Sequence, residues 1–200
     1  SDGSDARISE LAADLVARRV DVIFASTTPS AIAAKAATTA IPIVISSADA
    51  VGSGLVANLA RPGGNLTGMS LAIPEIAGNL LALLREALPS AGRLGLLVNG
   101  ADPFHRRLIE GVEAANFTVK VDLGIFRVSK PDELEPAFAR MVAERIDAAI
   151  VQPTLPRATV IALGMRYKLP TASPIAGFAR QGGFLSYSGR TDELSAVIAA

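Results

Sequence analysis

The chain has 200 residues, half of them hydrophobic, and its 19 basic and 19 acidic side chains cancel to a formal net charge of zero. This composition can bury a sizeable core, as one large domain or as two small lobes. Nucleic acid or an anionic membrane as a partner would require a basic excess or a basic stripe on a helix, and the sequence has neither. The absence of cysteine excludes disulfides, a thiol nucleophile and a thiolate metal site.

No targeting segment is predicted. Residues 1–5, SDGSD, are polar, and the longest apolar runs are too short and too often interrupted by charge to span a bilayer. We therefore expect a soluble chain, with any export signal lying upstream of Ser1.

Two helices and two strands are predicted before residue 60. In the first helix, apolar residues recur at helical spacing on one face, and the run VDVIFA has the β-branched character of a strand covered on both faces. Thr28 is expected to cap the second helix, with Pro29 in its first turn. The pattern predicts a helix over 5–18, a strand over 20–25, a helix from Thr28 to about residue 38 and a strand over 41–45.

The segment ARPGGNLTG, residues 60–68, is the strongest break in the pattern. Pro62 fixes its own φ and disfavours helix at Arg61, while Gly63 and Gly64 allow positive φ. A short extended stretch over 66–70 follows. We interpret it as a connector between two α/β lobes.

The second half of the chain alternates regularly between strand and helix with short loops. The predicted elements are a helix over 74–88, a strand over 93–98, a helix ending near 116, a strand over 119–128, a helix over 131–144, a strand over 146–151, a helix over 156–167, strands over 169–172 and 182–188, and a helix over 191–200. This alternation predicts an α/β fold with parallel sheets and helices on both faces.

The lobes are expected to be unequal. Only two clear strands precede Pro62, too few for a stable open sheet, so the first lobe is interpreted as incomplete. We predict that the late strand returns to it, which gives a first lobe of residues 1–69 and 184–200, a second lobe of 70–183, and more than one crossing between them. Exposed edges of the first sheet would then allow pairing between copies of the chain.

Ligands of open parallel sheets bind beyond the carboxyl ends of the strands. That rule selects the loops 26–30, 46–49, 99–105, 152–154 and 173–178. Thr28 and Asp102 precede prolines, so local capping explains them as well as ligand binding does. Asp49 has no obvious helix to cap, and a bound amino group would give its charge a partner. Phe178 is one of three aromatic residues, with Phe104 and Tyr187, expected near the ligand.

Several chemistries are disfavoured. His105 is the sole histidine, without a carboxylate cluster for a metal and without a GxSxG elbow for hydrolysis. No catalytic residue and no cofactor site are therefore predicted. Gly52, Gly54 and Ala57 match the dinucleotide fingerprint GxGxxA, but the preceding strand ends several residues too early. A nucleotide-binding Rossmann-type enzyme using residues 52–57 is the alternative interpretation.

The segments ADAVGSGLV (48–56) and LARPGGNLTG (59–68) resemble the extracytoplasmic substrate-binding proteins of ABC transporters that include tryptophan and phenylalanine binders. ASTTPSAIAAK (25–35), NGADPFH (99–105) and GGFLSYS (182–188) are similar to other recurrent stretches of that family. The resemblance covers essentially the whole chain. It implies a type I periplasmic-binding fold, with two lobes that close on a ligand and deliver it to a membrane permease.

The resemblance also implies a ligand site and a location. The implied ligand-contacting residues are Thr28, Ser46, Asp49, Asn99, Asp102 and Phe178. The ligand would be an amino acid or a similar small molecule, the chain would act in the periplasm or another extracytoplasmic space, and closure would be a hinge movement at 66–70 and 184–188. A weaker interpretation, the sensory lobes of a repressor, lacks a helix-turn-helix segment.

Overall fold

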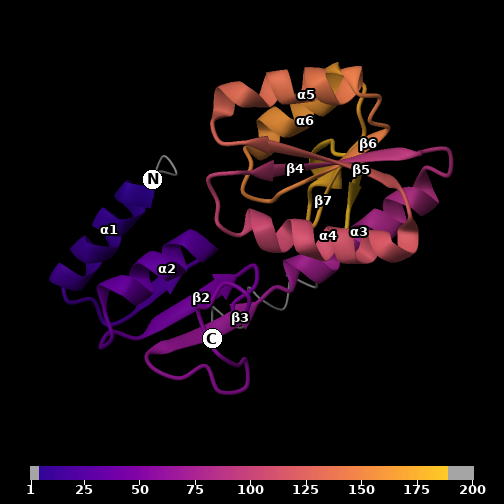
Figure 1. Cartoon of the computed structure of the whole chain (residues 1–200). Coiled ribbons are helices and arrows are strands. Elements are labelled where there is room, and N and C mark those ends of the chain that lie inside the picture. The colour runs from indigo at the N-terminus through magenta and orange to yellow at the C-terminus, as the bar shows by residue number, and fades with distance from the viewer. Residues whose placement is uncertain (1–4, 189–200) are drawn as a thin grey trace. The chain divides into compact units, whose positions relative to one another are not determined.

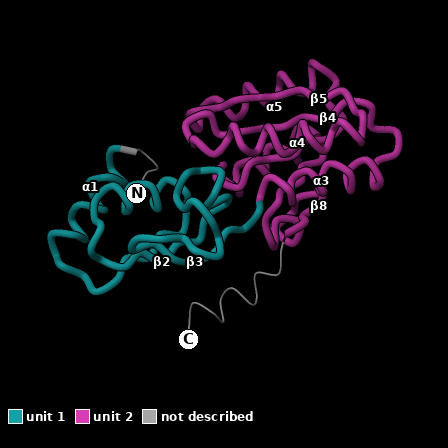
Figure 2. The backbone as a smooth tube through the Cα atoms, turned by 60° about the horizontal axis from the view of Figure 1, so that its bottom comes forward, with its two compact units in different colours: residues 1–72 teal, residues 73–200 magenta. Residues whose placement is uncertain are grey.

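The computed structural model describes residues 5–188. Contacts between Cα atoms divide the chain into two compact units, Ser1–Ala72 and Ile73–Ala200 (Figure 2). Each unit has its own sheet, and every strand pair in both sheets is parallel. The α/β class and the two-sheet organisation expected from the sequence are therefore confirmed.

The first unit is a three-stranded sheet in the order β1-β2-β3, with its two helices stacked on one side. Helix α2 packs against β1 and β2, and α1 packs against α2 (Figure 1). The core between α2, the sheet and the loop after β2 contains Ile23, Ala31, Ile43, Leu55 and Leu66. The elements are α1 (Asp5–Ala17), β1 (Ile23–Ala25), α2 (Thr28–Ala37), β2 (Ile43–Ser47) and β3 (Leu66–Ser70).

The residue that caps α2 is Thr27, and the prediction of Thr28 is wrong by one position. The Thr27 side chain accepts the backbone N–H of Ser30, and the Ser30 hydroxyl accepts the backbone N–H of Thr27, which together form a capping box. Thr28 is instead the first residue of the helix and is buried. Two adjacent threonines can each serve as a cap, and the residue type alone does not choose between them.

The extended stretch after the Pro-Gly-Gly break is a strand of the first sheet. Its five residues pair in register with β2, from Leu66 beside Ile43 to Ser70 beside Ser47. Gly68 has a φ of 140°, and a β-carbon on it would lie 2.0 Å from the carbonyl oxygen of Ile45. The first unit thus has three strands where the sequence indicates two, and a glycine is required in the third.

The second unit is a five-stranded sheet in the order β5-β4-β6-β7-β8 with helices on both faces. Helices α3 and α4 cover one face, and α5 and α6 cover the other (Figure 1). Its elements are α3 (Ile73–Ala87), β4 (Arg93–Asn99), α4 (His105–Val119), β5 (Asp122–Val128), a 3-10 turn (Pro131–Glu133), α5 (Leu134–Ala143), β6 (Ala148–Val151), α6 (Arg157–Arg166), β7 (Thr171–Ser173), a second 3-10 turn (Ala179–Gln181) and β8 (Leu185–Ser186).

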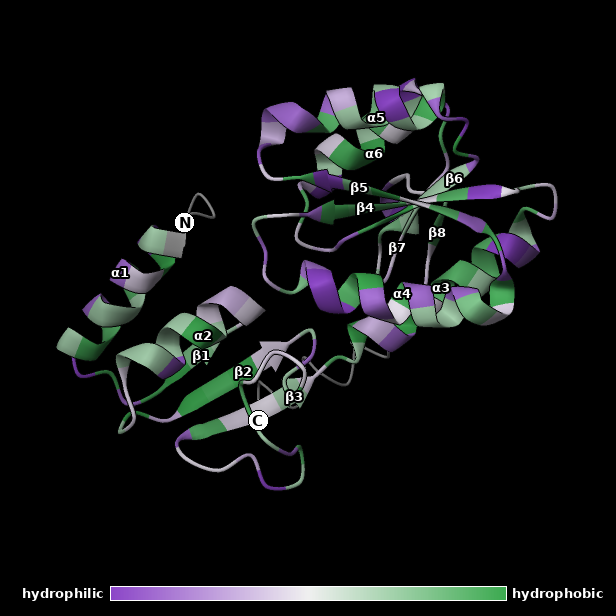
Figure 3. Cartoon of the chain, viewed as in Figure 1, coloured by the Kyte–Doolittle hydropathy of each residue, from purple (hydrophilic) through white to green (hydrophobic). Residues whose placement is uncertain are grey.

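Strands β4 and β6 form the buried centre of this sheet. All four residues of β6 are buried, as are the five residues of β4 between its two ends, and Figure 3 shows the matching apolar faces of the surrounding helices. Continuous apolar runs are typical of parallel strands covered on both sides. None of the helices in residues 5–188 combines the length and the apolar character needed to cross a bilayer.

The late strand does not follow the prediction. Leu185 and Ser186 pair with Ala172 and Ser173 of β7, so β8 lies in the second sheet and not in the first. The division between the units falls at Ala72, three residues beyond the predicted boundary, and the chain passes between the units once within residues 5–188. Residues 189–200, including the helix predicted there, lie outside the described residues.

Four helices are followed by a basic residue in the left-handed conformation: Arg19, Lys120, Arg145 and Lys168 have φ between 52° and 57°. A cation is favourable near the carboxyl end of a helix, but a β-carbon in this conformation costs about 1–2 kcal/mol. We expect Lys120→Gly to have a free energy of unfolding about 1 kcal/mol above that of Lys120→Ala, because both lose the charge and only glycine loses the strain. Urea unfolding of the two variants measures the difference, and equal stabilities would contradict it.

Candidate functional site

The second sheet has a topological switch point between its central strands β4 and β6. From β4 the chain passes through α4 on one face to β5, and from β6 it passes through α6 on the opposite face to β7. The loops that follow β4 and β6 therefore lead to opposite faces of the sheet. Ligands of open α/β sheets bind at the carboxyl ends of two such strands. Residues 99–104 and 152–156 form these two loops.

One buried carboxylate connects the two loops. The side chain of Asp102, 4% exposed, accepts three hydrogen bonds. Its Oδ1 accepts the backbone N–H of Phe104 at 3.0 Å, and its Oδ2 accepts Gln152 Nε2 at 2.8 Å and Thr154 Oγ1 at 3.0 Å. Because all three donors are neutral, the negative charge is held by hydrogen bonds and by the start of α4, not by an ion pair.

The same group fixes Asn99 at the end of β4. Gln152 Oε1 accepts the backbone N–H of Asn99 at 2.9 Å, which also establishes which end of the Gln152 amide is the oxygen. Asn99 Oδ1 in turn accepts the N–H of Ala101 at 3.0 Å. We call Asn99, Asp102, Gln152 and Thr154 the switch-point cluster. The cluster brings together Asn99 and Asp102, which were predicted as site residues, and Gln152 and Thr154, which were not.

Gln152 and Thr154 were missed as individual site residues, although their loop was selected. The available signal was the position of Gln152 directly after the apolar strand AAIV, where a buried polar side chain requires a partner on a neighbouring strand end. The sequence does not show which neighbouring strand that is. The strand order β4-β6 supplies the answer.

In the first unit, the predicted residues lie at the carboxyl ends of β1 and β2. Thr28 Oγ1 and Ser47 Oγ are both buried and lie 3.2 Å apart, a hydrogen bond that links the start of α2 to the end of β2. Ser46 is also buried. The Thr28 hydroxyl, at the first residue of α2, therefore lies beside the carboxyl end of β2.

Asp49 organises the turn that follows β2. Its Oδ1 accepts the N–H of Gly52 at 2.8 Å, and its backbone oxygen accepts the hydroxyl of Ser53. Lys35 of α2 holds the far side of this turn, with Nζ 3.0 Å and 2.9 Å from the carbonyl oxygens of Gly54 and Leu55. Asp49 therefore stabilises the turn of its own loop, and no helix begins there, as the sequence indicated.

The dinucleotide interpretation of residues 52–57 is not supported by their structure. The fingerprint requires a strand that leads directly into the glycine turn and a helix that starts there. Here β2 ends at Ser47, and residues 51–60 form turns and irregular backbone without a helix. The backbone N–H groups therefore lack the helix start that would bind a pyrophosphate.

The remaining predicted residues lie around the second sheet. Phe178 is 1% exposed and belongs to the core under α5 and α6, and it also lines a shallow hollow at the ends of β6 and β7. His105 Nδ1 lies 2.8 Å from the backbone oxygen of Asp102, which agrees with a local role at the start of α4. Within residues 5–188 no group of three or more His, Cys, Asp or Glu side chains is arranged to hold a metal ion.

At the amino ends of the strands, the second sheet carries charged side chains that pair with one another or with the backbone. There Arg93 pairs with Asp122, Nε to Oδ2, at 2.9 Å and donates to the backbone oxygen of Glu144 at 2.7 Å. Asp147 Oδ2 accepts the backbone N–H groups of Gly92 and Arg93. These contacts join the amino ends of β4, β5 and β6 and leave the carboxyl ends as the candidate site.

Parallel α/β units with polar groups at the carboxyl ends of their strands are the architecture on which many α/β proteins build a ligand site. The model of the family "ABC transporter substrate binding protein" matches residues 1–197. The chain belongs to this family, as its sequence resemblance implied.

Similar proteins agree with this assignment. A tyrosine-binding protein of Clostridioides difficile is 38% identical over 95 residues, a match that spans 46% of this chain and 26% of that protein. A structure from Streptococcus pneumonia, described as an ABC domain in complex with L-Trp, has a TM-score of 0.85 at 22% identity, covering 99% of this chain and 70% of the other. A conserved domain protein from Vibrio cholerae has a TM-score of 0.84 at 23% identity, and this match also covers 99% of this chain and 70% of the other. At these identities the two structures establish the fold.

Proposed function

We propose that the chain is the ligand-binding part of a substrate-binding protein that captures an amino acid, or a similarly small amphipathic molecule, for an ABC transporter. The observation that carries the proposal is the switch-point cluster, a polar group at the strand ends of a sheet in a chain of this family. The relatives' ligands, tyrosine and L-Trp, support an amino acid as the ligand class.

The partner and the location are parts of the same proposal. A membrane permease would receive the ligand, and the chain would act outside the cytoplasm. Binding alone meets this task, so no covalent step is assigned to any residue. The cleft between two lobes that the resemblance implies remains a prediction, as does pairing between copies through the edges of the first sheet.

The hydrogen-bonding capacity of the candidate residues suggests their roles. Thr28, Ser46 and the Asn99 amide supply donors suited to a ligand carboxylate or carbonyl. Asp49 supplies a carboxylate suited to an ammonium group. Both oxygens of Asp102 already accept internal hydrogen bonds, so we assign Asp102 to positioning the two loops and not to first contact with the ligand.

Calorimetry with the twenty L-amino acids tests this function. We expect one or a few of them to bind with 1:1 stoichiometry and to be recovered chemically unchanged. Asn99→Ala should weaken that binding about tenfold, the effect of losing one hydrogen bond to a charged group. Lys120→Ala is the matched control. Lys120 lies near the amino end of β5, away from the candidate site, so this variant should bind like the wild type. Absence of binding across the whole panel would contradict the ligand class.

A further inference from the structure

Strand β5 is an outer strand of the second sheet, and within residues 5–188 it pairs with β4 alone. At its two ends the N–H of Asp122 donates to the oxygen of Gly92, and the N–H of Gly100 donates to the oxygen of Val128. Along a strand, successive residues direct their N–H and C=O groups to alternate sides. The even-numbered residues of β5 therefore bond to β4. The backbone groups of the odd-numbered residues face away from the sheet: Leu123, Ile125 and Arg127.

Side chains close both ends of this outward edge. Asn116, near the end of α4, donates to the oxygen of Val121 at 3.0 Å and accepts its N–H at 2.9 Å. Beyond the strand, the N–H of Ser129 donates to Glu133 Oε2 at 2.6 Å. Between these points, the outward backbone groups of the three middle residues have no hydrogen-bond partner among the described residues. The open segment of the edge is therefore centred on Ile125.

The side chains of the open segment favour association. Phe126 belongs to the core under α5, so Leu123 and Ile125 lie on the other face of the sheet, which α4 covers. Both are only half-buried. The strand pairs with β4 over seven residues without a bulge or a proline, so two common features that block pairing at an edge are missing. Such an edge is a template for another strand.

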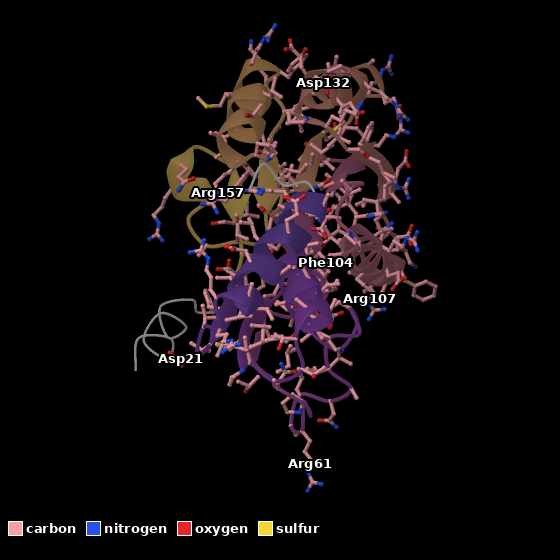
Figure 4. All side chains as sticks on the ribbon, turned by 90° about the vertical axis from the view of Figure 1, so that its left-hand side faces the viewer. Asp21, Arg61, Phe104, Arg107, Asp132 and Arg157 are labelled. Carbon is pink, nitrogen blue, oxygen red and sulfur yellow. The ribbon has the colours of Figure 1, made fainter. Side chains whose placement is uncertain are left out.

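An exposed phenylalanine lies on the same side of the second unit. Helix α3 packs against the side of α4 that carries Ala115, whose β-carbon would lie 2.9 Å from one added to Gly78. Phe117 is turned from Ala115 by about 200° around the helix, away from α3. Because α3 contacts β6 and β7 whereas α4 contacts β4 and β5, that side of α4 is nearer the β5 edge. Phe117 is 86% exposed, whereas elsewhere on α4 the exposed residues Arg107, labelled in Figure 4, and Glu110 form an ion pair at 2.7 Å.

We propose that a second copy of the chain pairs with this edge, β5 against β5 and antiparallel, around a two-fold axis at Ile125. Leu123 then lies opposite the partner's Arg127, and Ile125 lies opposite the partner's Ile125. Each pair exchanges two backbone hydrogen bonds, so every outward group of the open segment gains a partner. No pair in this register places like charges opposite each other. The inference concerns association of the second unit and goes beyond the proposed ligand-binding function.

The closed ends explain why the occupant is a copy of the same strand. A shift of the register by two residues would place Val121 or Ser129, whose outward N–H groups are already bonded, opposite the partner's open segment. The register centred on Ile125 is the one that uses all of the open groups of both strands. It is also its own two-fold image, so two identical chains satisfy it completely.

Because position 125 lies opposite itself, a single charge tests the register. Ile125→Lys and Ile125→Glu each place like charges opposite each other, and each should weaken self-association about tenfold or more in sedimentation equilibrium. An equimolar mixture of the two variants should associate again, because opposite charges then face each other. Met165→Lys is the control and should associate like the wild type. Met165 is 69% exposed and lies at the end of α6 beside Gly182, away from β5.

Hydrogen exchange of the wild-type chain gives a second measurement that does not depend on how the variants fold. The amides of Leu123, Ile125 and Arg127 should exchange more slowly as the protein concentration rises, because they become bonded in the dimer. The amide of Arg61, in the first unit, should exchange at a constant rate. Concentration-independent exchange at all three positions overturns the inference, as does association that Ile125→Lys leaves unchanged or that the mixture of folded variants does not restore. If neither variant folds, the exchange result decides.

Discussion

Replacing Gly68 by alanine is expected to unfold the first unit or to destabilise it by about 3 kcal/mol or more. The new β-carbon would lie 2.0 Å from the carbonyl oxygen and 2.6 Å from the nitrogen of Ile45, which are backbone atoms of the neighbouring strand. Neither can move away without breaking the pairing of β2 with β3. The φ of 140° adds strain for any residue with a side chain.

Hydrogen exchange resolved by residue measures this effect where it is expected. Amides of β1, β2 and β3 should lose protection in Gly68→Ala, while those of β4 and β6 keep theirs, because the two sheets belong to separate compact units. Gly92→Ala is the matched control, since a β-carbon there meets no atom within 4 Å. Wild-type protection of β2 and β3 in Gly68→Ala would show that the described pairing of these strands is wrong.

The second large effect is expected at Asp102. Asp102→Asn keeps the shape of the side chain but places an amide donor against the donors that the carboxylate accepts. At least one buried donor of the switch-point cluster then loses its acceptor, at a cost of about 1–3 kcal/mol. The loops after β4 and β6 would separate, and ligand binding should weaken together with stability.

The double variant Asp102→Asn/Gln152→Glu exchanges the two functional groups. The amide introduced at position 102 can donate to the carboxylate introduced at position 152, which can still accept the N–H of Asn99. The Thr154 hydroxyl can reverse its direction, and the total charge is unchanged. We expect the double variant to recover most of the stability that each single variant loses.

A double-mutant cycle on urea unfolding gives the coupling between positions 102 and 152. A coupling of about 1 kcal/mol or more is expected for groups in one hydrogen-bonded network. If binding recovers with stability, Asp102 acts by positioning the loops. If stability recovers but binding does not, the Asp102 carboxylate itself contacts the ligand, and its assignment as a positioning residue is wrong.

The alternation of strands and helices was predictable because it depends on local patterns. Apolar runs such as AAIV and LGLLV identify buried parallel strands, and helices with periodic leucines connect them. Two of the predictions that failed concern which sheet a short strand joins. β3 was interpreted as a connector and β8 was assigned to the first lobe, because pairing partners distant in sequence leave no local signal in strands of two to five residues.

The candidate site was predictable to the level of its loops. The rule that ligands bind at the carboxyl ends of parallel strands selected residues 99–105 and 152–154, and these are brought together by the order of β4 and β6. The contacts within the loops were not predictable. A capping role explained Asp102 equally well, and only the distances to Gln152 and Thr154 show that it joins two strands.

The most direct test of the proposed function is a map of backbone amide shifts when the ligand identified by calorimetry is added to the isotope-labelled chain. We expect the largest shifts in the second unit at residues 99–104 and 152–156, around the switch-point cluster. The amide signals at the amino ends of the strands should not shift; these are the signals of residues 92–93, 122 and 144–147. Shifts concentrated at the amino ends of the strands, with the loops after β4 and β6 unaffected, would contradict the proposed site.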